Sequence, residues 1–408
     1  MQRPVIVVNP LSSGIELAAT FGARQVPAVA VVFKPRDQMS YGTKVRASDF
    51  IDIVPVQDKL EDILREHNPL AVIPGTESSV ALAEKLSEAL TPEFSNDPSK
   101  SLSRVHKAHM QRALVDSGIP AIETLDASSE AEVERWLVEK NLLNAPLILK
   151  PPISAGSDKV FHIPSSGDWR NAFRRITSEP STITQEISKT AIVQEEAIGT
   201  EYAVGTVSAH GKHYLSHLIK YNKASANDRK TLFDHVEFMA FNEEAHGELF
   251  EYTQKVLDAL GIRWGAAHNE VMLTEKGPRL IETGARMLGG PTVGFSREAT
   301  GCSQADRLAE VYIDGDVQSK EYTFKKTVVP VFLHSPIEGV VSNTEALDGV
   351  SKLPSLFEKH VYFENGSKVP QTVDYLTTIG IIALSGDREQ IFKDYKKIRE
   401  MESRLHFS

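Results

Sequence analysis

The sequence contains almost no cysteine and no long apolar run. Cys302 is the only cysteine among the 408 residues, which excludes a disulfide framework and a cysteine-rich zinc site and is typical of a reducing, cytoplasmic compartment. No stretch reaches the roughly 18 apolar residues that a membrane-spanning helix needs. The apolar run Val5–Val8 is too short for the core of a signal peptide. We therefore interpret it as a buried strand and expect no membrane partner.

Positive charge is also scarce. The 55 acidic residues outnumber the 45 lysines and arginines, and the formal net charge is −10. Because a nucleic-acid surface is normally basic, we expect no nucleic-acid partner, although an acidic protein can carry a local basic pocket for a nucleotide. GxGxxG does not follow the first strand, which argues against an NAD-dependent enzyme. GxxxxGK[ST] does not occur, which excludes a Walker A loop.

The length predicts two or three domains, at roughly 150 residues each. Up to residue 95, apolar runs alternate with helical periodicity, as in an α/β domain of right-handed parallel units. The Pro-, Ser- and Asn-rich stretch Thr91–Ser103 marks a first boundary, and strand-like stretches return after about residue 315. Strands are predicted at Val5–Val8, Val26–Phe33, Leu70–Ile73, Leu147–Lys150, Ile192–Glu195, Glu201–Ser208, Lys212–Lys220, Trp264–Leu273, Pro278–Glu282, Thr327–Leu333, Val361–Phe363 and Thr378–Leu384. Helices are predicted at Ile15–Arg24, Lys59–His67, Val80–Leu90, Arg104–Ser117, Glu130–Glu139, Asp168–Thr177, Glu248–Leu260, Ala305–Ile313 and Arg388–Glu402.

Acidic side chains lie on two consecutive predicted strands. Glu270 and Glu282 flank Thr274–Pro278, whose Gly and Pro predict a hairpin turn. The two carboxylates would then lie on neighbouring antiparallel strands, close enough to share a cation. Arg286 follows four residues after Glu282, ahead of a glycine pair. Since magnesium prefers one or two carboxylates plus phosphate oxygens, this segment predicts Mg²⁺-assisted chemistry on a phosphate.

Two upstream segments could complete a nucleotide site. Lys150 ends a short strand, and the small-residue loop Pro151–Lys159 after it could bring backbone N–H groups to phosphate oxygens. In Val193–Ala203 a strand runs into a tight glycine turn, where Glu201 could hold a ribose and exposed backbone could pair with adenine. Each segment alone is also compatible with a solvated loop. Gly75–Glu77, at a helix start, could hold an anion or be a plain N-cap.

The histidines form no pattern typical of a metal site. His213 and His217 would share one face of a strand, with His210 in the turn before it, but no cysteine accompanies them. We interpret these three residues, and His106 and His109 at a helix start, as ordinary satisfied or exposed histidines. We also find no Ser/His/Asp order that indicates a catalytic triad.

The order and spacing of five motifs over roughly residues 1–315 resemble those of the ATP-grasp ligases. The motifs are Lys107, Lys150 with its Ser/Gly loop, Gln194–Glu201, Glu270, and Glu282-x-Gly-x-Arg286. The resemblance implies an ATP-grasp fold of mixed α/β and α+β class. It implies a Rossmann-like pre-grasp domain at 1–95, an ATP-grasp domain at 96–314 with a lid at about 120–193, and a C-terminal α+β domain at 315–408.

The resemblance also implies roles for individual residues. ATP would be held by Lys107, Lys150, Gly156, Ser157, Glu195, Ala197 and Glu201, with backbone groups of Glu195 and Ala197 on adenine and Glu201 on the ribose. Two Mg²⁺ (or Mn²⁺) ions would be ligated by Glu270 and Glu282. Glu282 and Arg286 would be catalytic, with Arg286 stabilising an acyl phosphate and a tetrahedral intermediate. Substrates would contact His268, Arg286, Gly289 and Gly290.

One position departs from the family pattern. Many ATP-grasp enzymes have Glu-x-Asn-x-Arg, in which the Asn is a further metal ligand, and Gly284 holds that place here. The number of metal ions therefore stays open. The stretch from Glu282 to Gly290, together with Ala266–Glu270 and the long C-terminal domain, is similar to the L-amino acid ligases, which form dipeptides.

The resemblance implies an ATP-dependent carboxylate–amine ligase that joins amino acids, or an amino-acid-like acid and an amino acid, through an acyl phosphate. Its partners would be small-molecule amino-acid substrates, and a homodimer, common among similar enzymes, is compatible with the sequence. Two alternatives stay open: an ATP-grasp enzyme that uses bicarbonate or a non-amino-acid carboxylate, and a non-catalytic ATP-binding sensor. Residues that shape the substrate pocket are sought in Tyr221–Lys230, His235, Met287 and Leu288, each equally compatible with loop or core.

Overall fold

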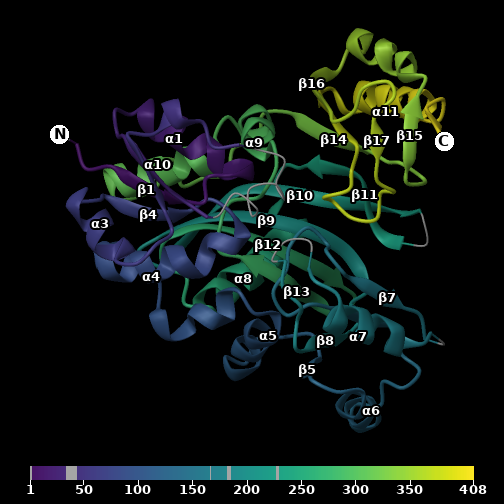
Figure 1. Cartoon of the computed structure of the whole chain (residues 1–408), viewed down its shortest axis with the longest axis horizontal. Coiled ribbons are helices and arrows are strands. Elements are labelled where there is room, and N and C mark those ends of the chain that lie inside the picture. Colours follow the sequence, from purple (N-terminus) through teal and green to yellow (C-terminus); the bar gives the residue numbers. More distant parts are fainter. Residues whose placement is uncertain (1, 34–43, 166, 182–184, 227–228) are drawn as a thin grey trace.

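An eight-stranded antiparallel sheet forms the centre of the protein, with smaller sheets arranged around it (Figure 1). The computed structural model describes residues 2–33, 44–165, 167–181, 185–226 and 229–408. Among these residues, none of the helices is both long and apolar enough to cross a membrane.

The N-terminal residues form a parallel sheet in the order β3-β2-β1-β4. Its strands are β1 (Val5–Val8), β2 (Ala28–Val32), β3 (Asp52–Pro55) and β4 (Ala71–Pro74), and its helices are α1 (Ile15–Gly22), α3 (Leu60–Glu66) and α4 (Val80–Leu90). All four residues of β1 are fully buried because both faces are covered. Val5 and Val7 pack with α1, whereas Ile6 and Val8 pack with α3 and α4. The predicted α/β arrangement is confirmed, and β3 is a strand that the sequence did not predict.

A small antiparallel sheet in the order β5-β8-β6-β7 follows along the chain. Its elements are β5 (Thr124–Ala127), α6 (Glu130–Glu139), β6 (Leu147–Lys150), β7 (Phe161–Ile163), α7 (Trp169–Ser178) and β8 (Ala191–Glu195). Leu147 and Leu149 of β6 pack with both helices in one core. The alternate residues Ile148 and Lys150 therefore point away from that core, toward the central sheet.

The central sheet has the order β13-β12-β9-β10-β11-β14-β18-β16. Its strands are β9 (Gly199–Ala209), β10 (Lys212–Ala226), β11 (Arg229–Phe238), β12 (Gly265–Thr274), β13 (Gly277–Gly284), β14 (Thr327–Leu333), β16 (Leu356–Val361) and β18 (Gly380–Gly386), and the helices along it are α5 (Lys107–Asp116), α8 (Glu243–Ala259), α9 (Thr292–Thr300) and α10 (Gln304–Asp314). The sequence missed β11 and α9. The strand predicted at Val361–Phe363 is wrong in position, since the strand ends at Val361. The sheet continues across residue 315, and the domain boundary predicted there stays a prediction.

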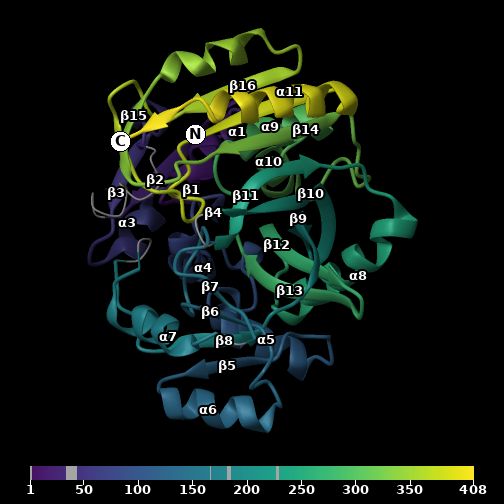
Figure 2. The ribbon, with the colours of Figure 1, turned by 90° about the vertical axis from the view of Figure 1, so that its right-hand side faces the viewer.

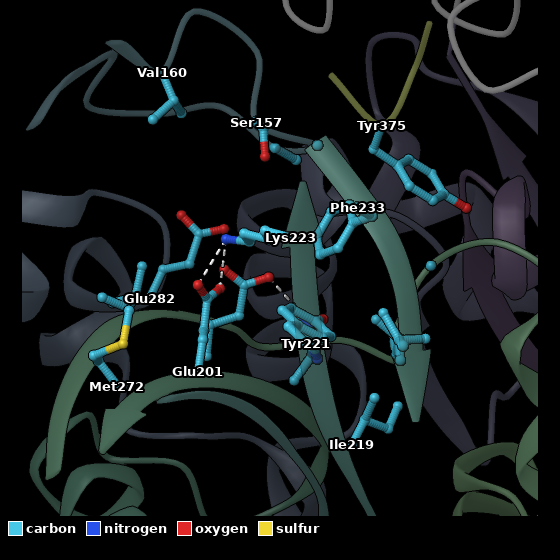
Figure 3. A pocket seen from close by; sticks show the side chains of 18 of the residues that line it. Ser157, Val160, Glu201, Ile219, Tyr221, Lys223, Phe233, Met272, Glu282 and Tyr375 are labelled. Atoms are coloured by element: carbon cyan, nitrogen blue, oxygen red, sulfur yellow. Dashed lines mark hydrogen bonds and ion pairs between the residues drawn. The ribbon is translucent and has the colours of Figure 1, made fainter. Parts of the chain in front are cut away.

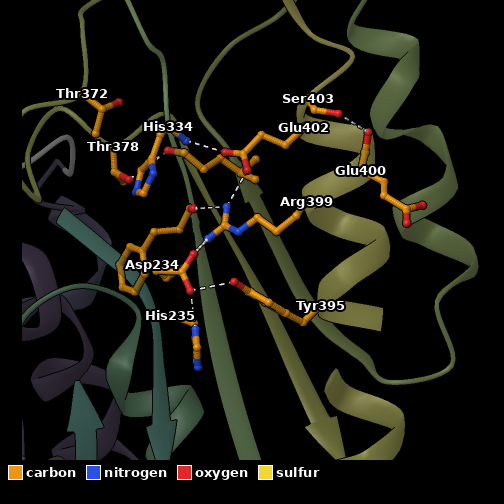
Figure 4. A network of polar contacts seen from close by, with 12 residues as sticks. Asp234, His235, His334, Thr372, Thr378, Tyr395, Arg399, Glu400, Glu402 and Ser403 are labelled. Atoms are coloured by element: carbon orange, nitrogen blue, oxygen red, sulfur yellow. Dashed lines mark hydrogen bonds and ion pairs between the residues drawn. The ribbon is translucent and has the colours of Figure 1, made fainter. Parts of the chain in front are cut away.

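The last part of the chain adds a small sheet and a closing helix. These elements are β15 (Gly339–Ser342), β17 (Lys368–Val369), α11 (Arg388–Glu402) and β19 (His406–Phe407), with β15 between β17 and β19. Arg399 of α11 pairs with Asp234 of β11 at 2.7 Å, and Tyr395 donates a hydrogen bond to the same carboxylate at 2.7 Å (Figure 4). This network fixes α11 against the central sheet. In Figure 2, α11 lies at the opposite end of the molecule from α6.

Arg104 connects the N-terminal sheet region to the central region. It ends the 3₁₀ helix η6 (Pro98–Arg104), is fully buried, and pairs with Glu84 of α4. Its guanidinium also donates hydrogen bonds to the carbonyl oxygens of Leu260, at 2.7 Å, and Asp97, at 2.9 Å. One side chain thus satisfies three groups from separate parts of the chain.

Arg104→Met is expected to lower the free energy of unfolding by about 3–5 kcal/mol, because it leaves the partly buried carboxylate of Glu84 without a positive charge. Urea unfolding followed by circular dichroism measures the change. The matched control is Arg112→Met, which removes the exposed pair with Asp116 on α5 and should cost at most about 1 kcal/mol. Equal losses in the two variants would contradict the bridging role of Arg104.

Candidate active site

A cavity of about 690 Å³ lies between the small sheet, the central sheet and loops from both ends of the chain. The site residues named from the sequence that line it are Lys107, Lys150, Gly156, Ser157, Glu195, Ala197, Glu201, His268, Glu270, Glu282, Arg286 and Gly289. Gly290 is not part of the lining, and its backbone N–H donates to Ser12 Oγ at 2.8 Å instead. The structure thus brings together residues from widely separated parts of the sequence.

Glu270 of β12 and Glu282 of β13 are direct cross-strand partners. This register confirms the prediction that the two glutamates lie on neighbouring antiparallel strands. Glu282 Oε2 lies 3.2 Å from Lys107 Nζ, and Glu270 Oε1 lies 3.2 Å from His268 Nε2. Burial opposes ionisation of Glu270, but the hydrogen bond from His268 and the nearby positive charges hold its pKa below the usual range. Two carboxylates therefore face the same part of the cavity.

Two buried lysines face these carboxylates. Lys107, the first residue of α5, donates to the carbonyl oxygen of Ser154 at 2.9 Å and also contacts Glu282. Lys150 is the last residue of β6 and is 3% exposed. Burial lowers the pKa of Lys150 to about 8, an effect that the charge of Glu282 partly offsets. Both ammonium groups are point charges suited to phosphate oxygens.

ATP affinity is expected to depend on pH through Lys150. Its ammonium form, which attracts phosphate, dominates below its pKa of about 8 and is lost as the pH rises through that value. We expect the dissociation constant for ATP to rise by up to about tenfold per pH unit above about pH 8. Lys150→Arg should remove this dependence because arginine stays charged. Calorimetric titration of ATP across that range measures it.

Lys150→Ala should lower the affinity for ATP at every pH below about 8, where the lysine carries its charge. The matched control is Lys276→Ala, a change at an exposed lysine in the turn between β12 and β13. An ATP affinity of Lys150→Ala equal to that of the unmodified protein would exclude contact between Lys150 and the phosphates.

Lys223 of β10 adds a third ammonium group that the sequence located only within the broad range Tyr221–Lys230. Its Nζ lies 2.6 and 2.9 Å from the two carboxylate oxygens of Glu201 (Figure 3). Burial lowers the pKa of Lys223, but the charges of Glu201 and Glu270 outweigh burial and raise it overall. Lys223 therefore stays charged beside the carboxylates of β9 and β12.

The hinge between the two sheets lines the cavity with exposed backbone and apolar side chains. β8 ends at Glu195 and β9 begins at Gly199, so Glu196–Ile198 connect the small sheet to the central one. Ile198 is 72% exposed although it lines the cavity. Further apolar side chains on these walls are Ile122, Ile148, Val160, Met272 and Ile281.

The loop Pro151–Lys159 reaches from the small sheet to the C-terminal part of the chain. Gly156 has φ +65°, a left-handed conformation that favours glycine. Its carbonyl oxygen accepts a hydrogen bond from the N–H of Tyr375 at 3.3 Å, and a β-carbon at Gly156 would lie 3.3 Å from Leu376 Cγ. Ser157 of this loop lines the cavity (Figure 3). We expect Gly156 to let this loop move, and Gly156→Pro therefore to lower turnover in a steady-state assay.

Arg286 lies at the N-terminal side of the cavity, paired with a residue from the first sheet. Its Nε lies 2.8 Å from Glu77 Oε2, and its Nη1 donates to the carbonyl oxygen of Met287 at 2.9 Å. Glu77 begins the 3₁₀ helix η4 (Glu77–Ser79), which follows β4. The N-cap interpretation of this segment is confirmed, because Thr76 and Ser79 form a capping box. The alternative, an anion site at this helix start, stays a prediction; the Glu77 carboxylate in the first turn pairs with Arg286.

The residues present fit a magnesium or manganese ion that is completed by phosphate. Glu270 and Glu282 supply oxygen ligands from adjacent strands, beside lysines suited to phosphate. Among the described residues, no group of three or more His, Cys, Asp or Glu could hold a metal ion by itself. His268 Nδ1 is buried and has no hydrogen-bond partner in the described part of the chain. The oxygen-only pair indicates a site that needs ligand oxygens to be complete.

The prediction that His213 and His217 share one face of a strand is wrong. A β-bulge between Leu215 and His217 shifts the register, so His213 and His217 do not share a face. His213 Nε2 lies 3.3 Å from Asp258 of α8, whereas His217 Nδ1 lies 3.3 Å from Ser296 of α9. Both rings are buried, and burial lowers the pKa of each.

The pocket-shaping candidates divide between cavity and core. Tyr221 and Leu288 line the cavity. Met287 is buried in the core beneath the N-terminal sheet. His235 packs against Tyr395 of α11 with ring centroids 5.0 Å apart. The sequence offered no signal for Tyr375, which enters the cavity from a loop some ninety residues after Arg286.

Known proteins resemble this chain over most of its length. The profile of the ATP-grasp domain family matches residues 143–294. Dapdiamide A synthase from Enterobacter agglomerans is 28% identical over 357 residues, which span 84% of this chain and 82% of that protein. The crystal structure of an L-amino acid ligase from Bacillus licheniformis superposes with a TM-score of 0.74 at 17% identity, over 100% of this chain and 99% of that one. Carboxyaminoimidazole ribonucleotide synthase from Aspergillus clavatus, solved with ATP, has a TM-score of 0.71 at 15% identity and 99% coverage of both chains.

The fold, the cavity and these similarities define the class: the chain carries an ATP-grasp domain and has the ATP-grasp fold throughout. Within that class, the proteins that it resembles include dapdiamide A synthase and an L-amino acid ligase, which points to the ATP-grasp ligases that form C–N bonds.

Proposed function

We propose that this enzyme joins the carboxylate of one amino acid, or of an amino-acid-like acid, to the amine of another, through an acyl phosphate and with release of ADP and phosphate. The observation that carries the proposal is the arrangement of charge in one cavity. Glu270 and Glu282 face Lys107 and Lys150 in the cavity, and the Arg286 guanidinium lies beside Gly284, two residues from Glu282. The similarity to dapdiamide A synthase and to an L-amino acid ligase supports amino-acid-like substrates.

In the first step the carboxylate attacks the γ-phosphate of ATP, so two anions must approach one another. Lys107 and Lys150 offset this repulsion from fixed, buried positions, where a charge acts more strongly than in water. Bound at Glu270 and Glu282, Mg²⁺ or Mn²⁺ would supply further positive charge to the phosphate oxygens. Glu201 would hold the ribose, and the hinge backbone at Glu195 and Ala197 would hold adenine.

In the second step the amine attacks the acyl carbon and phosphate leaves. Negative charge develops on the former carbonyl oxygen, and a guanidinium can donate to two oxygens at once. Arg286 is suited to this task because Glu77 and the carbonyl of Met287 hold it in place. The loop Pro151–Lys159 would exclude water, which otherwise hydrolyses an acyl phosphate.

The test is a screen of the enzyme with ATP, Mg²⁺ and pairs of amino acids, with phosphate release as the readout and mass spectrometry of the products. We expect phosphate release that requires both an acid and an amine, together with an amide product. Release with bicarbonate alone would favour a carboxylase. ATP binding without phosphate release for any pair would favour a sensor.

A further inference from the structure

Gly284 is the position where the sequence departs from related ATP-grasp enzymes, and its surroundings explain the glycine. A β-carbon placed on Gly284 would lie 2.7 Å from Glu77 Oε2, closer than such atoms approach one another. It would also lie 3.2 and 3.3 Å from Cζ and Nη2 of Arg286. An asparagine at this position would therefore displace the Glu77–Arg286 pair. The glycine makes room for a carboxylate that comes from the N-terminal sheet.

Glu77 is held firmly at the carboxyl end of β4. A β-carbon on Gly75 would lie 2.5 Å from the carbonyl oxygen of Asn9, so the loops after β1 and β4 pack backbone against backbone. The side-chain amide of Asn9 donates to Thr76 Oγ1 at 3.0 Å, and Thr76 caps the helix that Glu77 begins. The Glu77 side chain is 15% exposed and lines the cavity. Its position is therefore set before any substrate binds.

Glu77 also differs from the other acids of the cavity in its place. Glu201, Glu270 and Glu282 lie on the central sheet, beside the lysines suited to phosphate. Glu77 comes from the N-terminal sheet instead, and its carboxylate lies beside Gly284 and Arg286, next to a loop that contributes Ser12. A carboxylate has about four acceptor positions, more than its contact with Arg286 Nε uses. It can therefore accept further hydrogen bonds from a cation in the cavity.

We propose that Glu77 binds the ammonium group of the amine substrate and places that nitrogen beside Arg286, at the acyl carbon. This inference rests on the proposed ligase function and adds the group that recognises the second substrate. An amino acid near neutral pH carries its amine as ammonium, which has three donors and a positive charge. A fixed carboxylate with room for further hydrogen bonds complements that group. Arg286 and Glu77 would thus hold the acyl oxygen and the ammonium side by side, and the ammonium gives one proton to the Glu77 carboxylate before its nitrogen attacks the acyl carbon.

The experiment compares two nucleophiles in Glu77→Gln. The first is the amine substrate found in the screen, and the second is hydroxylamine, which is uncharged near neutral pH and traps an acyl phosphate as a hydroxamate. We expect kcat/KM for the amine to fall at least about 100-fold, as when a charged hydrogen-bond partner is lost. The rate of hydroxamate formation should stay within about threefold of that of the unmodified enzyme. Glu93→Gln, on the exposed surface of the same sheet region, should change neither rate.

Equal losses of amide and hydroxamate would overturn the inference, because Glu77 would then act only by positioning Arg286 or by binding the acid. An unchanged kcat/KM for the amine would overturn it too. If Glu77→Gln does not fold, Glu77→Asp tests the same contact, since it keeps the charge but withdraws the carboxylate by one methylene, and the same selective loss is expected. Failure of the proposed ligase function gives a different result: the unmodified enzyme would form no hydroxamate with ATP and any acid.

Discussion

Glu282→Gln is expected to lower kcat by at least about 100-fold, the scale of losing one main electrostatic stabiliser in a catalytic site. Glu282 faces Glu270 across two strands and contacts Lys107 at 3.2 Å. A glutamine keeps the size of the side chain but removes the charge that would bind a divalent cation and keep Lys107 in place. Steady-state phosphate release at saturating ATP and substrates measures the loss.

The matched control is Glu275→Gln, the same chemical change at an exposed residue in the turn between β12 and β13. Its kcat should equal that of the unmodified enzyme. Thermal unfolding of both variants checks that the fold is intact. A folded Glu282→Gln variant with nearly normal turnover would show that Glu282 does not hold the catalytic cation.

Arg286→Lys is expected to lower kcat by about 100-fold or more, although the charge is retained. Lysine has one nitrogen, which can contact Glu77 or the acyl oxygen but cannot hold both in the geometry of a guanidinium. In the present geometry Nε faces Glu77 at 2.8 Å and Nη1 bonds to the Met287 carbonyl. The affinity for ATP should change little, because Lys107 and Lys150 face the phosphate side.

Turnover and calorimetric ATP affinity, measured on the same preparation, test this separation. Arg279→Lys, on the same strand region but bonded to carbonyls of the hairpin turn, is the control and should keep normal turnover. Turnover of Arg286→Lys within about threefold of the unmodified enzyme would exclude transition-state stabilisation by a bidentate guanidinium.

Local features of the chain could be predicted from the sequence because they depend on short-range patterns. The apolar run of β1, the helix α6 between Ser129 and Lys140, and the hairpin of β12 and β13 are set by periodicity, capping and turn residues. The order of these elements was enough to place Glu270 opposite Glu282. The resemblance to ATP-grasp ligases added the lysines and the hinge, which line the same cavity.

The remaining features depend on contacts between distant segments, which no local pattern encodes. Glu77 has the appearance of an ordinary acidic residue in a helix first turn, and only the fold brings it to Arg286, some two hundred residues later. The bulge before His217 changes which face each histidine occupies, although strand alternation placed them together. β11 was not predicted because its charged residues interrupt the alternation of apolar and polar residues. Its Asp234 pairs with Arg399, which lies near the end of the chain.

The most direct test of the proposed reaction follows oxygen from the acid substrate. The acid is labelled with ¹⁸O in its carboxylate and incubated with the enzyme, ATP, Mg²⁺ and the amine, and the released phosphate is analysed by mass spectrometry. The acyl phosphate route predicts that each phosphate carries one labelled oxygen from the carboxylate and that ADP accumulates in equal amount. Phosphate without label, or AMP and pyrophosphate in place of ADP and phosphate, would contradict it.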